Sequence, residues 1–397
     1  MRMMDGVGGS RVLRRLRRWL VGAATVLVAS GVAVVVVASP ASAAVSKWLM
    51  VSPGSSHTCG IKVDTTLWCW GDNRWGQLGI GRWGSAESTP QEVGGTGWSV
   101  VSTGSDFTCG IRDGYRYCWG NNDNGQLGIG NTTDHYSPVR RSGENNNWAT
   151  VTTGSRHACG LRTSGLAQCW GDNSFGQVGD RTTTDRFSPT TVYTVLPTGW
   201  RSLSAGYNFT CALTANGGRR ACWGSNYRGA LGLDIGPGDV LEPTSVPGEG
   251  EWLSIDATGN SACGIRLIAF IRTLECWGQL VDSRKPVSVG GAGWASISVG
   301  LRHACGIKLS AIVTGERLRY CWGENMFGQV GDGTETDRPS PVFVDDGPWD
   351  TIEAGIQHNC GTSPSKRLYC WGSNQARQLG VGTPFPYRSL EPVLVSG

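Results

Sequence analysis

CWGDNRWGQLG, residues 69–79, is the first of seven related stretches in this chain of 397 residues. The six others are CWGNNDNGQLG from Cys118, CWGDNSFGQVG from Cys169, CWGSNYRGALG from Cys222, a truncated CWGQL from Cys276, CWGENMFGQVG from Cys321 and CWGSNQARQLG from Cys370. They recur about every fifty residues, an interval typical of architectures that repeat one supersecondary unit. We therefore expect one repeated domain over residues 44–397 rather than two or three unrelated domains.

Each repeat unit contains four short strand-like segments in a fixed order, bounded by turn residues. The first begins with a tryptophan, the second contains one cysteine, the third contains Cys-Trp-Gly, and the fourth opens with a proline, which can start a strand without losing a ladder hydrogen bond. Sixty glycines and eighteen tryptophans favour tight turns and aromatic-lined strands over helices. The pattern predicts an all-β fold, a seven-bladed β-propeller with four-stranded blades.

The two ends of the repeat region favour a closed ring over an open solenoid. No proline segment precedes the tryptophan segment at Trp48, and no tryptophan segment follows the last proline segment, residues 392–395. We predict that this C-terminal strand joins the N-terminal blade and closes the ring. Closure removes the sheet edges that a solenoid has to cap.

The charge of the chain is concentrated at its N-terminus. The formal net charge is +4, but residues 1–43 hold six arginines and one aspartate, so that the remaining chain carries −1. Binding to a phosphate backbone normally needs a strong positive field. We therefore expect no nucleic-acid partner.

Residues 1–43 read as an export signal. An arginine-rich start precedes an apolar run over residues 19–38, and Ala41-Ser42-Ala43 fits an A-x-A cleavage rule. We expect cleavage near Ala43 and a secreted or cell-envelope, extracytoplasmic protein. Two alternatives stay open: an uncleaved membrane anchor, since about 20 apolar residues can span a bilayer, and a twin-arginine signal at Arg17-Arg18.

Fourteen cysteines follow this leader, two in every unit. An even count behind an export signal favours a disulfide inside each repeat, whereas zinc binding is disfavoured because no C-x-x-C occurs. Each staple restricts the unfolded chain by roughly 2.5–3 kcal/mol in the chain-entropy description. The expected pairs are Cys59 and Cys69, Cys109 and Cys118, Cys159 and Cys169, Cys211 and Cys222, Cys263 and Cys276, Cys305 and Cys321, and Cys360 and Cys370.

The motif W-G-x-N-x-x-G-Q-L-G, preceded by G-x-x-H-[TA]-C-G and followed by T-x-T-D-R-x-S-P, resembles the regulator of chromosome condensation repeat. The resemblance covers residues 48–397 and implies a seven-bladed propeller closed by both chain ends. The best-known member of this family promotes nucleotide exchange on a nuclear GTPase, which an exported chain would not meet. Secreted bacterial members include inhibitors that lay one propeller face over a β-lactamase, which implies a protein partner.

This chain departs from the family pattern in two ways. Each unit has cysteines at two positions that the family usually fills with small, apolar or polar residues. The fifth unit keeps Cys276-Trp277-Gly278 but lacks the N-x-x-G-Q-L-G loop and passes directly to Pro286. We expect this blade to present a different surface.

No catalytic constellation, metal site or cofactor is predicted. His57, His157, His303 and His358 share one repeat position that holds phenylalanine or serine in other units, which favours packing and a hydrogen bond to the neighbouring blade over catalysis. The aspartate spacing of 180 and 185 recurs at 332 and 337, which indicates turn chemistry rather than a glycosidase carboxylate pair.

Three tryptophans, Trp68, Trp75 and Trp83, lie outside the repeated tryptophan positions, beside Arg74 and Arg82 in the first unit. Tryptophan and arginine anchor many protein interfaces, and aromatic faces also bind sugars. These five residues are therefore our binding candidates. Packing is the alternative reading for Trp75, because phenylalanine holds its place in two other units.

The hairpin between the paired cysteines of the fifth unit is long and apolar, and Phe270 lies within it. An exposed apolar rim would mark an interaction site, whereas a hairpin that packs on its neighbour would not. We add Phe270 to the binding candidates.

The sequence favours an exported, monomeric, non-enzymatic scaffold that binds a macromolecule, with a protein as the expected partner, through loops on one propeller face. An enzyme acting on extracellular polysaccharide and a carbohydrate-binding lectin are the alternatives. No membrane contact is expected unless the leader remains uncleaved.

Overall fold

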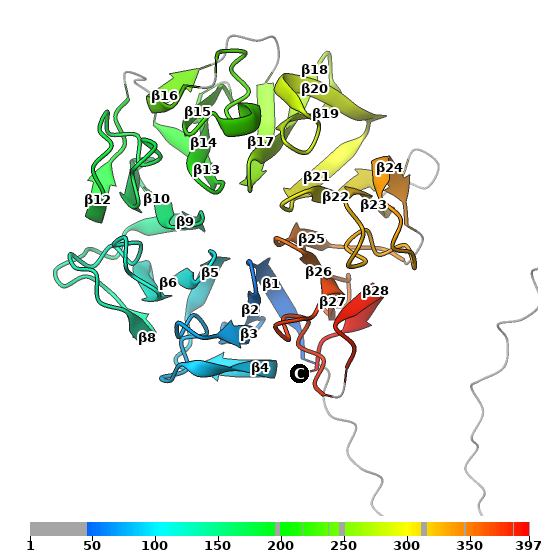
Figure 1. Cartoon of the computed structure of the whole chain (residues 1–397), viewed down its shortest axis with the longest axis horizontal. Coiled ribbons are helices and arrows are strands. Elements are labelled where there is room, and N and C mark those ends of the chain that lie inside the picture. Colours follow the sequence, from blue (N-terminus) through cyan, green and yellow to red (C-terminus); the bar gives the residue numbers. More distant parts are fainter. Residues whose placement is uncertain are drawn as a thin grey trace, which may run out of the picture. The chain divides into compact units, whose positions relative to one another are not determined.

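The computed structural model describes residues 46–194, 199–216, 218–236, 238–245, 251–310, 316–344, 347–383 and 385–396. Seven antiparallel sheets of four strands form a ring, with the first strand of each sheet innermost (Figure 1). This confirms the predicted seven-bladed all-β propeller. The predicted leader, residues 1–43, lies outside the described residues. Within the described ranges, no helix is long and apolar enough to cross a membrane.

Each blade consists of four consecutive strands and is numbered by its order in the chain. Blades 1 to 4 are β1 (Trp48–Pro53), β2 (His57–Lys62), β3 (Leu67–Asn73), β4 (Gly84–Val93); β5 (Trp98–Thr103), β6 (Phe107–Arg112), β7 (Tyr115–Gly120), β8 (His135–Val139); β9 (Trp148–Thr153), β10 (His157–Arg162), β11 (Ala167–Gly171), β12 (Arg186–Thr191); and β13 (Trp200–Ala205), β14 (Phe209–Thr214), β15 (Arg220–Gly224), the short 3-10 turn η1 (Tyr227–Gly229), β16 (Val240–Ser245). Blades 5 to 7 are β17 (Glu251–Thr258), β18 (Ser261–Ile268), β19 (Ile271–Gly278), β20 (Ser283–Ala292); β21 (Trp294–Val299), β22 (His303–Leu309), β23 (Arg317–Gly323), β24 (Arg338–Phe343); and β25 (Thr351–Ala354), β26 (His358–Thr362), β27 (Leu368–Ser373), β28 (Arg388–Leu394).

The predicted exchange of the C-terminal strand is wrong. β28 pairs with β27 of its own blade, where Val393 lies opposite Cys370, and β1 to β4 form a complete sheet without it. The described residues form seven complete four-strand units, so none of these blades lacks a strand. Contacts between complete blades close the ring instead: Trp70 Nε1 donates to Gln378 O (2.9 Å), and the Trp48 amide donates to Lys366 O (2.8 Å).

The tryptophan of Cys-Trp-Gly locks each blade to the one before it. Trp119 Nε1 donates a hydrogen bond to Gln77 O of blade 1 (2.9 Å), and its ring lies against Gly79. The indole is fully buried, so that the bond satisfies a donor which would otherwise be costly to desolvate. The same bond to the preceding blade recurs at 2.8–3.0 Å for Trp70, Trp170, Trp223, Trp277 and Trp371.

Trp322 is the exception to this lock. It follows blade 5, which lacks the glycine-rich loop, and its buried Nε1 has no hydrogen-bond partner among the described residues. The shortened connection between β19 and β20 therefore removes the acceptor that the other blades supply. The truncation seen in the sequence thus alters the inter-blade packing as well as the surface.

The asparagine and the glutamine that recur in the loop motif fix the shape of the loop through hydrogen bonds within it. Asn73 Oδ1 accepts from the Leu78 amide (3.2 Å), its Nδ2 donates to Arg82 O (3.0 Å), and Gln77 Oε1 accepts from the Trp75 amide (2.9 Å). Equivalent bonds form at Asn173 and Asn325. The motif is therefore a scaffold rather than a ligand cradle.

The aspartate pairs of the third and sixth units belong to the same loop chemistry, as predicted. Asp185 accepts from the Asn173 amide (2.9 Å), while Asp180 accepts from Thr182 and forms an ion pair with Arg186. Asp337 and Asp332 repeat both roles in blade 6. Each of these carboxylates accepts a hydrogen bond within its own loop.

All seven cysteine pairs lie within single blades. In each, the two residues face each other on the second and third strands, as Cys59 and Cys69 do, and the sulfur atoms are 2.04–2.15 Å apart. Every pair thus fastens the middle of a sheet, between the innermost strand and the outer edge.

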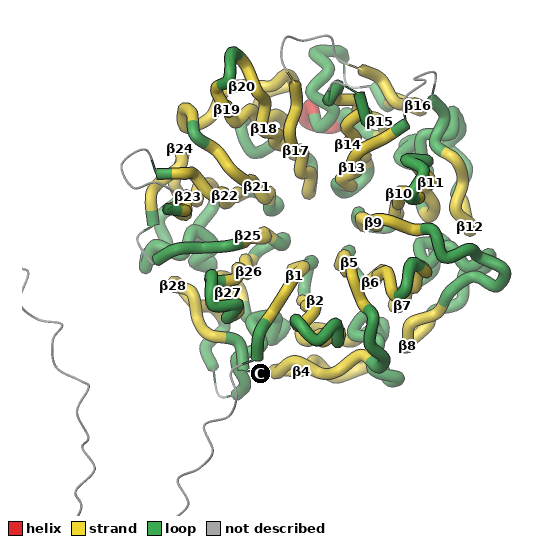
Figure 2. Tube along the Cα trace, turned by 180° about the vertical axis from the view of Figure 1, so that it is seen from behind, coloured by secondary structure: helices red, strands yellow, loops and turns green. Residues whose placement is uncertain are grey.

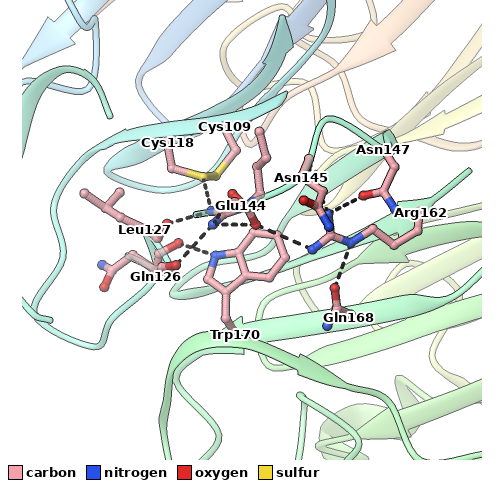
Figure 3. Close-up of polar contacts among 12 residues, drawn as sticks. Cys109, Cys118, Gln126, Leu127, Glu144, Asn145, Asn147, Arg162, Gln168 and Trp170 are labelled. Carbon is pink, nitrogen blue, oxygen red and sulfur yellow. Dashed lines mark hydrogen bonds and ion pairs between the residues drawn. A yellow bond between two sulfur atoms is a disulfide. The ribbon is translucent and has the colours of Figure 1, made fainter. Parts of the chain in front are cut away.

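Blade 2 carries a buried ion cluster at the position that holds leucine or alanine in blades 1, 3, 5 and 7. The fully buried Arg116 guanidinium donates to Leu127 O (2.7 Å), lies 4.4 Å from the Trp170 ring centre, and pairs with Glu144 (3.3 Å). Glu144 also faces Arg162 at 3.7 Å (Figure 3). Burial lowers the pKa of Arg116 to about 10, so that the group stays charged at neutral pH. Arg220 and Arg319 occupy the same position in blades 4 and 6.

We expect Glu144→Ala to lower the free energy of unfolding by about 3–5 kcal/mol, because it leaves a buried guanidinium without its counter-charge. The double variant Arg116→Leu/Glu144→Leu should lose about 2 kcal/mol or less, since removing both charges leaves none unpaired, and Leu67 fills this place in blade 1. Denaturant unfolding under oxidising conditions measures both. Equal losses in the two variants would contradict the role of the ion pair.

Gly79 has a φ of +72°, and a Cβ there would lie 2.6 Å from Trp119 Nε1. Gly79→Ala should therefore cost about 2–5 kcal/mol of unfolding free energy, from the left-handed backbone plus overpacking at the blade lock. Gly81→Ala is the matched control, because its φ is +80° but its nearest neighbour is 3.7 Å away. It should cost about 1–2 kcal/mol; an equal cost at both positions would refute the packing contribution.

Candidate binding face

The up-and-down order of strands gives the ring two different faces. The turn between the first and second strands of each blade and the loop between the third and fourth strands lie on one side, which we call the loop face. The hairpins between the second and third strands lie on the other side, which we call the hairpin face. Figures 1 and 2 show the ring from these opposite sides.

Two of the predicted tryptophans lie on the loop face, in the connection between β3 and β4. Trp75 is 41% exposed and Trp83 is 62% exposed. The Trp83 ring lies 6.1 Å from that of Tyr136 in blade 2, so that the pair spans the boundary between two blades. The two predicted arginines flank them but are engaged in ion pairs, Arg74 with Asp72 (2.8 Å) and Arg82 with Glu87 (2.7 Å).

Trp68 lies at the opposite end of β3, next to the hairpin face, and is packed. Lys62 Nζ sits 3.7 Å from its ring centre, and Trp68 Nε1 donates to Thr66 Oγ1 (2.9 Å). The same pairing of a second-strand cation with a third-strand residue joins Arg112 to Tyr117 in blade 2. Trp68 therefore fills a repeated structural position, and the structure does not bring it together with Trp83.

Phe270 is at the tip of the β18–β19 hairpin and is 97% exposed. Ala269 and Phe270 both have positive φ, +49° and +66°, a conformation that costs most residues about 1–2 kcal/mol. The hairpin holds the ring out from the hairpin face rather than against a neighbouring blade. Phe270 is thus separate from Trp75 and Trp83, and the sequence candidates divide between two faces.

Sequence reasoning missed a hollow of about 650 Å³ on the loop face, beside the shortened loop of blade 5. Its lining residues come from blades 3, 4 and 5 and combine aromatic, amide and charged side chains: Phe175, Tyr207, Asn208, Ser225, Tyr227, Arg228, Asp239, Asn260 and Arg284. We call it the blade-5 hollow. In the sequence, the truncation at Gly278 points to this part of the face, but it does not predict which residues line the hollow.

A second hollow of about 480 Å³ lies between blades 7 and 1 and includes Asp72 and Arg74. A third opening, lined by the turns between first and second strands, lies where six of the blades converge. All three are on the loop face. The hollowed side of the propeller is thus also the side that carries Trp75 and Trp83.

The innermost strands place one polar side chain per blade around the ring: Ser52, Ser102, Thr152, Ser204, Asp256, Ser298 and Glu353. In blades 1 to 6 its oxygen accepts a hydrogen bond of 2.7–3.2 Å from a backbone amide of the next blade. The corresponding residue beyond Glu353 is Pro53, which has no N–H. Glu353 is therefore the one member of this ring without that amide bond.

The environment of Glu353 favours its neutral form. Burial, together with the nearby Asp256 carboxylate, raises the pKa of Glu353 to about 8, and a hydrogen bond from Ser298 Oγ (3.4 Å) partly opposes this rise. Burial also raises the pKa of Asp256, which the Val299 amide partly offsets. Ser298 Oγ lies within reach of both carboxyl groups, so they share one hydroxyl donor.

The four repeated histidines bond to the neighbouring blade, as predicted. His57 Nε2 lies 2.8 Å from Thr108 Oγ1, which itself donates to Gln77 O (2.8 Å). Since that hydroxyl proton is used, Nε2 must donate, and buried Nδ1 keeps an unpaired lone pair. Burial lowers the pKa of His57 to about 4. The equivalent contacts are His157 with Thr210, His303 with Asn359 and His358 with Thr58.

Within the described ranges, no group of three or more histidine, cysteine, aspartate or glutamate side chains is arranged to hold a metal ion. The loop face combines exposed aromatic rings, arginines, amides and shallow hollows on a frame held by disulfides.

Comparison with known proteins identifies the repeat. The family profile of the regulator of chromosome condensation (RCC1) repeat matches residues 64–111, 113–161, 164–213 and 320–361, and a second profile of that repeat matches residues 148–177.

Two curated relatives share 30% identity with about half of the chain. The ultraviolet-B receptor UVR8 of Arabidopsis thaliana aligns over 209 residues, 49% of this chain and 46% of that protein. The probable E3 ubiquitin-protein ligase HERC6 of Homo sapiens aligns over 213 residues, 49% of this chain and 20% of that protein. The match therefore spans less than half the length of either relative.

Solved structures show the same fold at lower identity. Human WBSCR16 superposes with a TM-score of 0.70 and 20% identity, over 80% of this chain and 87% of that chain. Prp20p of Saccharomyces cerevisiae, described with its binding properties to Gsp1p and histones, gives 0.72 and 18% over 88% of both chains.

We expect the stability of the protein to fall as pH rises from about 6.5 to about 9. The raised pKa of Glu353 means that the folded state holds a proton which the unfolded chain has already lost, so that the stabilisation disappears as pH passes about 8. Above pH 6.5, only about 1.5 pH units remain below the folded-state pKa, so linkage gives a loss of about 2 kcal/mol over this interval. Glu353→Gln should flatten this pH dependence in denaturant unfolding, whereas exposed Glu391→Gln should leave it unchanged. The same slope in wild type and Glu353→Gln would show that Glu353 does not cause it.

Proposed function

Since the chain is built from RCC1 repeats in a seven-bladed propeller, we propose that it is an extracytoplasmic, non-enzymatic scaffold that binds a protein partner through the loop face. One observation carries this proposal: exposed aromatic side chains gather on the loop face of blades 1 to 4 and 7. They are Trp75, Trp83, Tyr136, Phe175, Phe187, Tyr227 and Tyr387, each 37–80% exposed. Rigid aromatic residues anchor many protein interfaces, because they bury a large area and lose little entropy.

The frame beneath these residues supports a recognition role. Seven disulfide pairs and the inter-blade tryptophan bonds hold the loops in fixed positions, which reduces the ordering cost of binding. The same disulfides suit an oxidising compartment, in line with the export signal predicted over residues 1–43. Prp20p, a protein of the same fold, is described as binding Gsp1p and histones, which makes protein binding the first function to test.

The repeated histidines and the paired aspartates, which the sequence offers as candidate catalytic groups, have structural roles. The four repeated histidines are buried and bonded between blades, and Asp180 and Asp332 are used within their own loops. These arrangements support a scaffold over a hydrolase.

Carbohydrate binding is the second candidate, favoured by the flat and widely exposed rings of Trp83 and Tyr387, which are 62% and 80% exposed. Aromatic faces of this kind stack on sugars as well as on proteins. A glycan array with the mature chain distinguishes the two: saturable glycan binding that Trp83→Ala abolishes would favour the lectin reading.

We expect a photo-crosslinking residue at position 75 or 83 to capture a protein partner in the producing cells. The same residue at position 166, an exposed leucine on the hairpin face, should capture none. With the captured partner purified, Trp83→Ala should weaken binding about tenfold or more, the loss of about 1.4 kcal/mol typical of an anchor residue. Leu166→Ala is the matched control. Capture from position 166 alone would overturn the assignment of the face.

A further inference from the structure

The blade-5 hollow differs in charge from the equivalent places around the ring. In blades 1, 2, 3 and 6 the loop glycine is covered by an aromatic or leucine residue on the outer strand of the next blade, Tyr136 over Gly76 and Phe187 over Gly125, for example. Blade 5 places Arg284 over Gly229 instead. An apolar or aromatic cover is thus replaced by a cation at this one boundary among those described.

A second position of the repeat also changes from an uncharged residue to an arginine. The residue before the loop glycine is uncharged in the other blades that have this glycine, namely Trp75, Asn124, Phe175 and Phe327, but it is Arg228 in blade 4. Arg228 has a φ of +58°, a left-handed conformation that a long side chain rarely adopts, within the turn η1. Two independent departures from the repeat therefore bring two arginines to one hollow.

Neither guanidinium is committed to an internal carboxylate. Arg228 and Arg284 are both exposed and line the hollow, and neither forms an ion pair with any described residue. The nearby Asp234 is paired with Lys285 (3.2 Å), and Asp239 is the single carboxylate in the lining. Other arginines on the loop face are ion-paired, either within their own loop, as Arg74 is with Asp72, or with the next blade, as Arg181 is with Glu242.

The rest of the lining is suited to a peptide. Tyr227 is 57% exposed at the rim, Phe175 and Tyr207 add aromatic walls, and Asn208 and Asn260 offer amide donors and acceptors that match a peptide backbone. A volume of about 650 Å³ falls in the range of ligand sites. Two arginine forks recognise carboxylates in a planar, bidentate geometry.

We infer that the blade-5 hollow binds an acidic segment of the partner protein, with a glutamate or aspartate carboxylate between Arg228 and Arg284 and an adjacent apolar side chain against Tyr227 and Phe175. This inference rests on the proposed function, because it names the chemistry that the loop face selects. The negative charge of Asp239 repels a second acidic side chain on its side of the hollow and so sets the direction in which the segment binds.

The test uses the full mature chain and three probes. The first is a fluorescein-labelled peptide of glutamates around one phenylalanine, the second has glutamine in place of glutamate, and the third is an oligogalacturonate of the same charge. The acidic peptide should bind saturably in fluorescence anisotropy, at least about tenfold more tightly than the glutamine peptide, and more weakly as salt screens the charges. No saturable binding of the acidic peptide, or equal binding of the glutamine peptide, would overturn the inference.

Arg228→Gln and Arg284→Gln should each weaken binding of the acidic peptide about tenfold or more, without changing the unfolding midpoint, since both side chains are exposed. Arg272→Gln, the same change of charge at an exposed site by the β18–β19 hairpin, is the control and should bind normally. Equal loss in all three variants would indicate a non-specific charge effect and refute the hollow as the site. Tighter binding of the oligogalacturonate than of the acidic peptide would overturn the inference and indicate that the hollow binds an acidic glycan.

The two proposals fail separately. If positions 75 and 83 capture a partner but the hollow does not bind the acidic peptide, the loop-face proposal holds and the hollow is ruled out as a binding site. If the acidic peptide binds but a partner is captured only from the hairpin face, the loop face is ruled out as the main interface.

Discussion

The hydrogen bond from a buried tryptophan Nε1 to a loop carbonyl of the preceding blade is the contact on which this propeller depends. It forces the loop to present a carbonyl, such as Gln77 O, at the blade boundary, and it forces a glycine, Gly79, where the indole ring passes. The internal bonds of the loop around Asn73 follow from the need to hold that carbonyl in place. Residues that look like a ligand motif in the sequence are therefore a joint between sheets.

Periodicity explains which parts of the fold could be predicted. The blade number, the strand count, the facing cysteines and the histidine contact to a neighbouring blade each recur several times, and recurrence exposes a structural role. The closure was mispredicted because the two ends were read as incomplete units, although Trp48 opens a first strand and Pro392 lies in a fourth. Counting complete units would have assigned β28 to its own blade.

The candidate binding residues were harder to predict, because the two ends of every strand lie on opposite faces of the ring. Trp68 and Trp75 are seven positions apart, yet β3 carries one toward the hairpin face and the other to the loop face. Trp68 also proved to be packed under Lys62, in a pairing that varies in chemistry from blade to blade. The blade-5 hollow joins residues from three units, and no linear pattern places Phe175, Tyr227 and Arg284 together.

The self-contained blades have a consequence for how the molecule is made. In a ring sealed by strand exchange, the first sheet waits for the last residues of the chain. Here Cys59 can meet Cys69 inside a sheet that is complete at Val93, some three hundred residues before the C-terminus is available. Each blade can thus mature in order as the chain emerges from a ribosome. Among the described contacts, the docking of blade 7 against blade 1, where Trp70 meets Gln378, requires both ends of the ring.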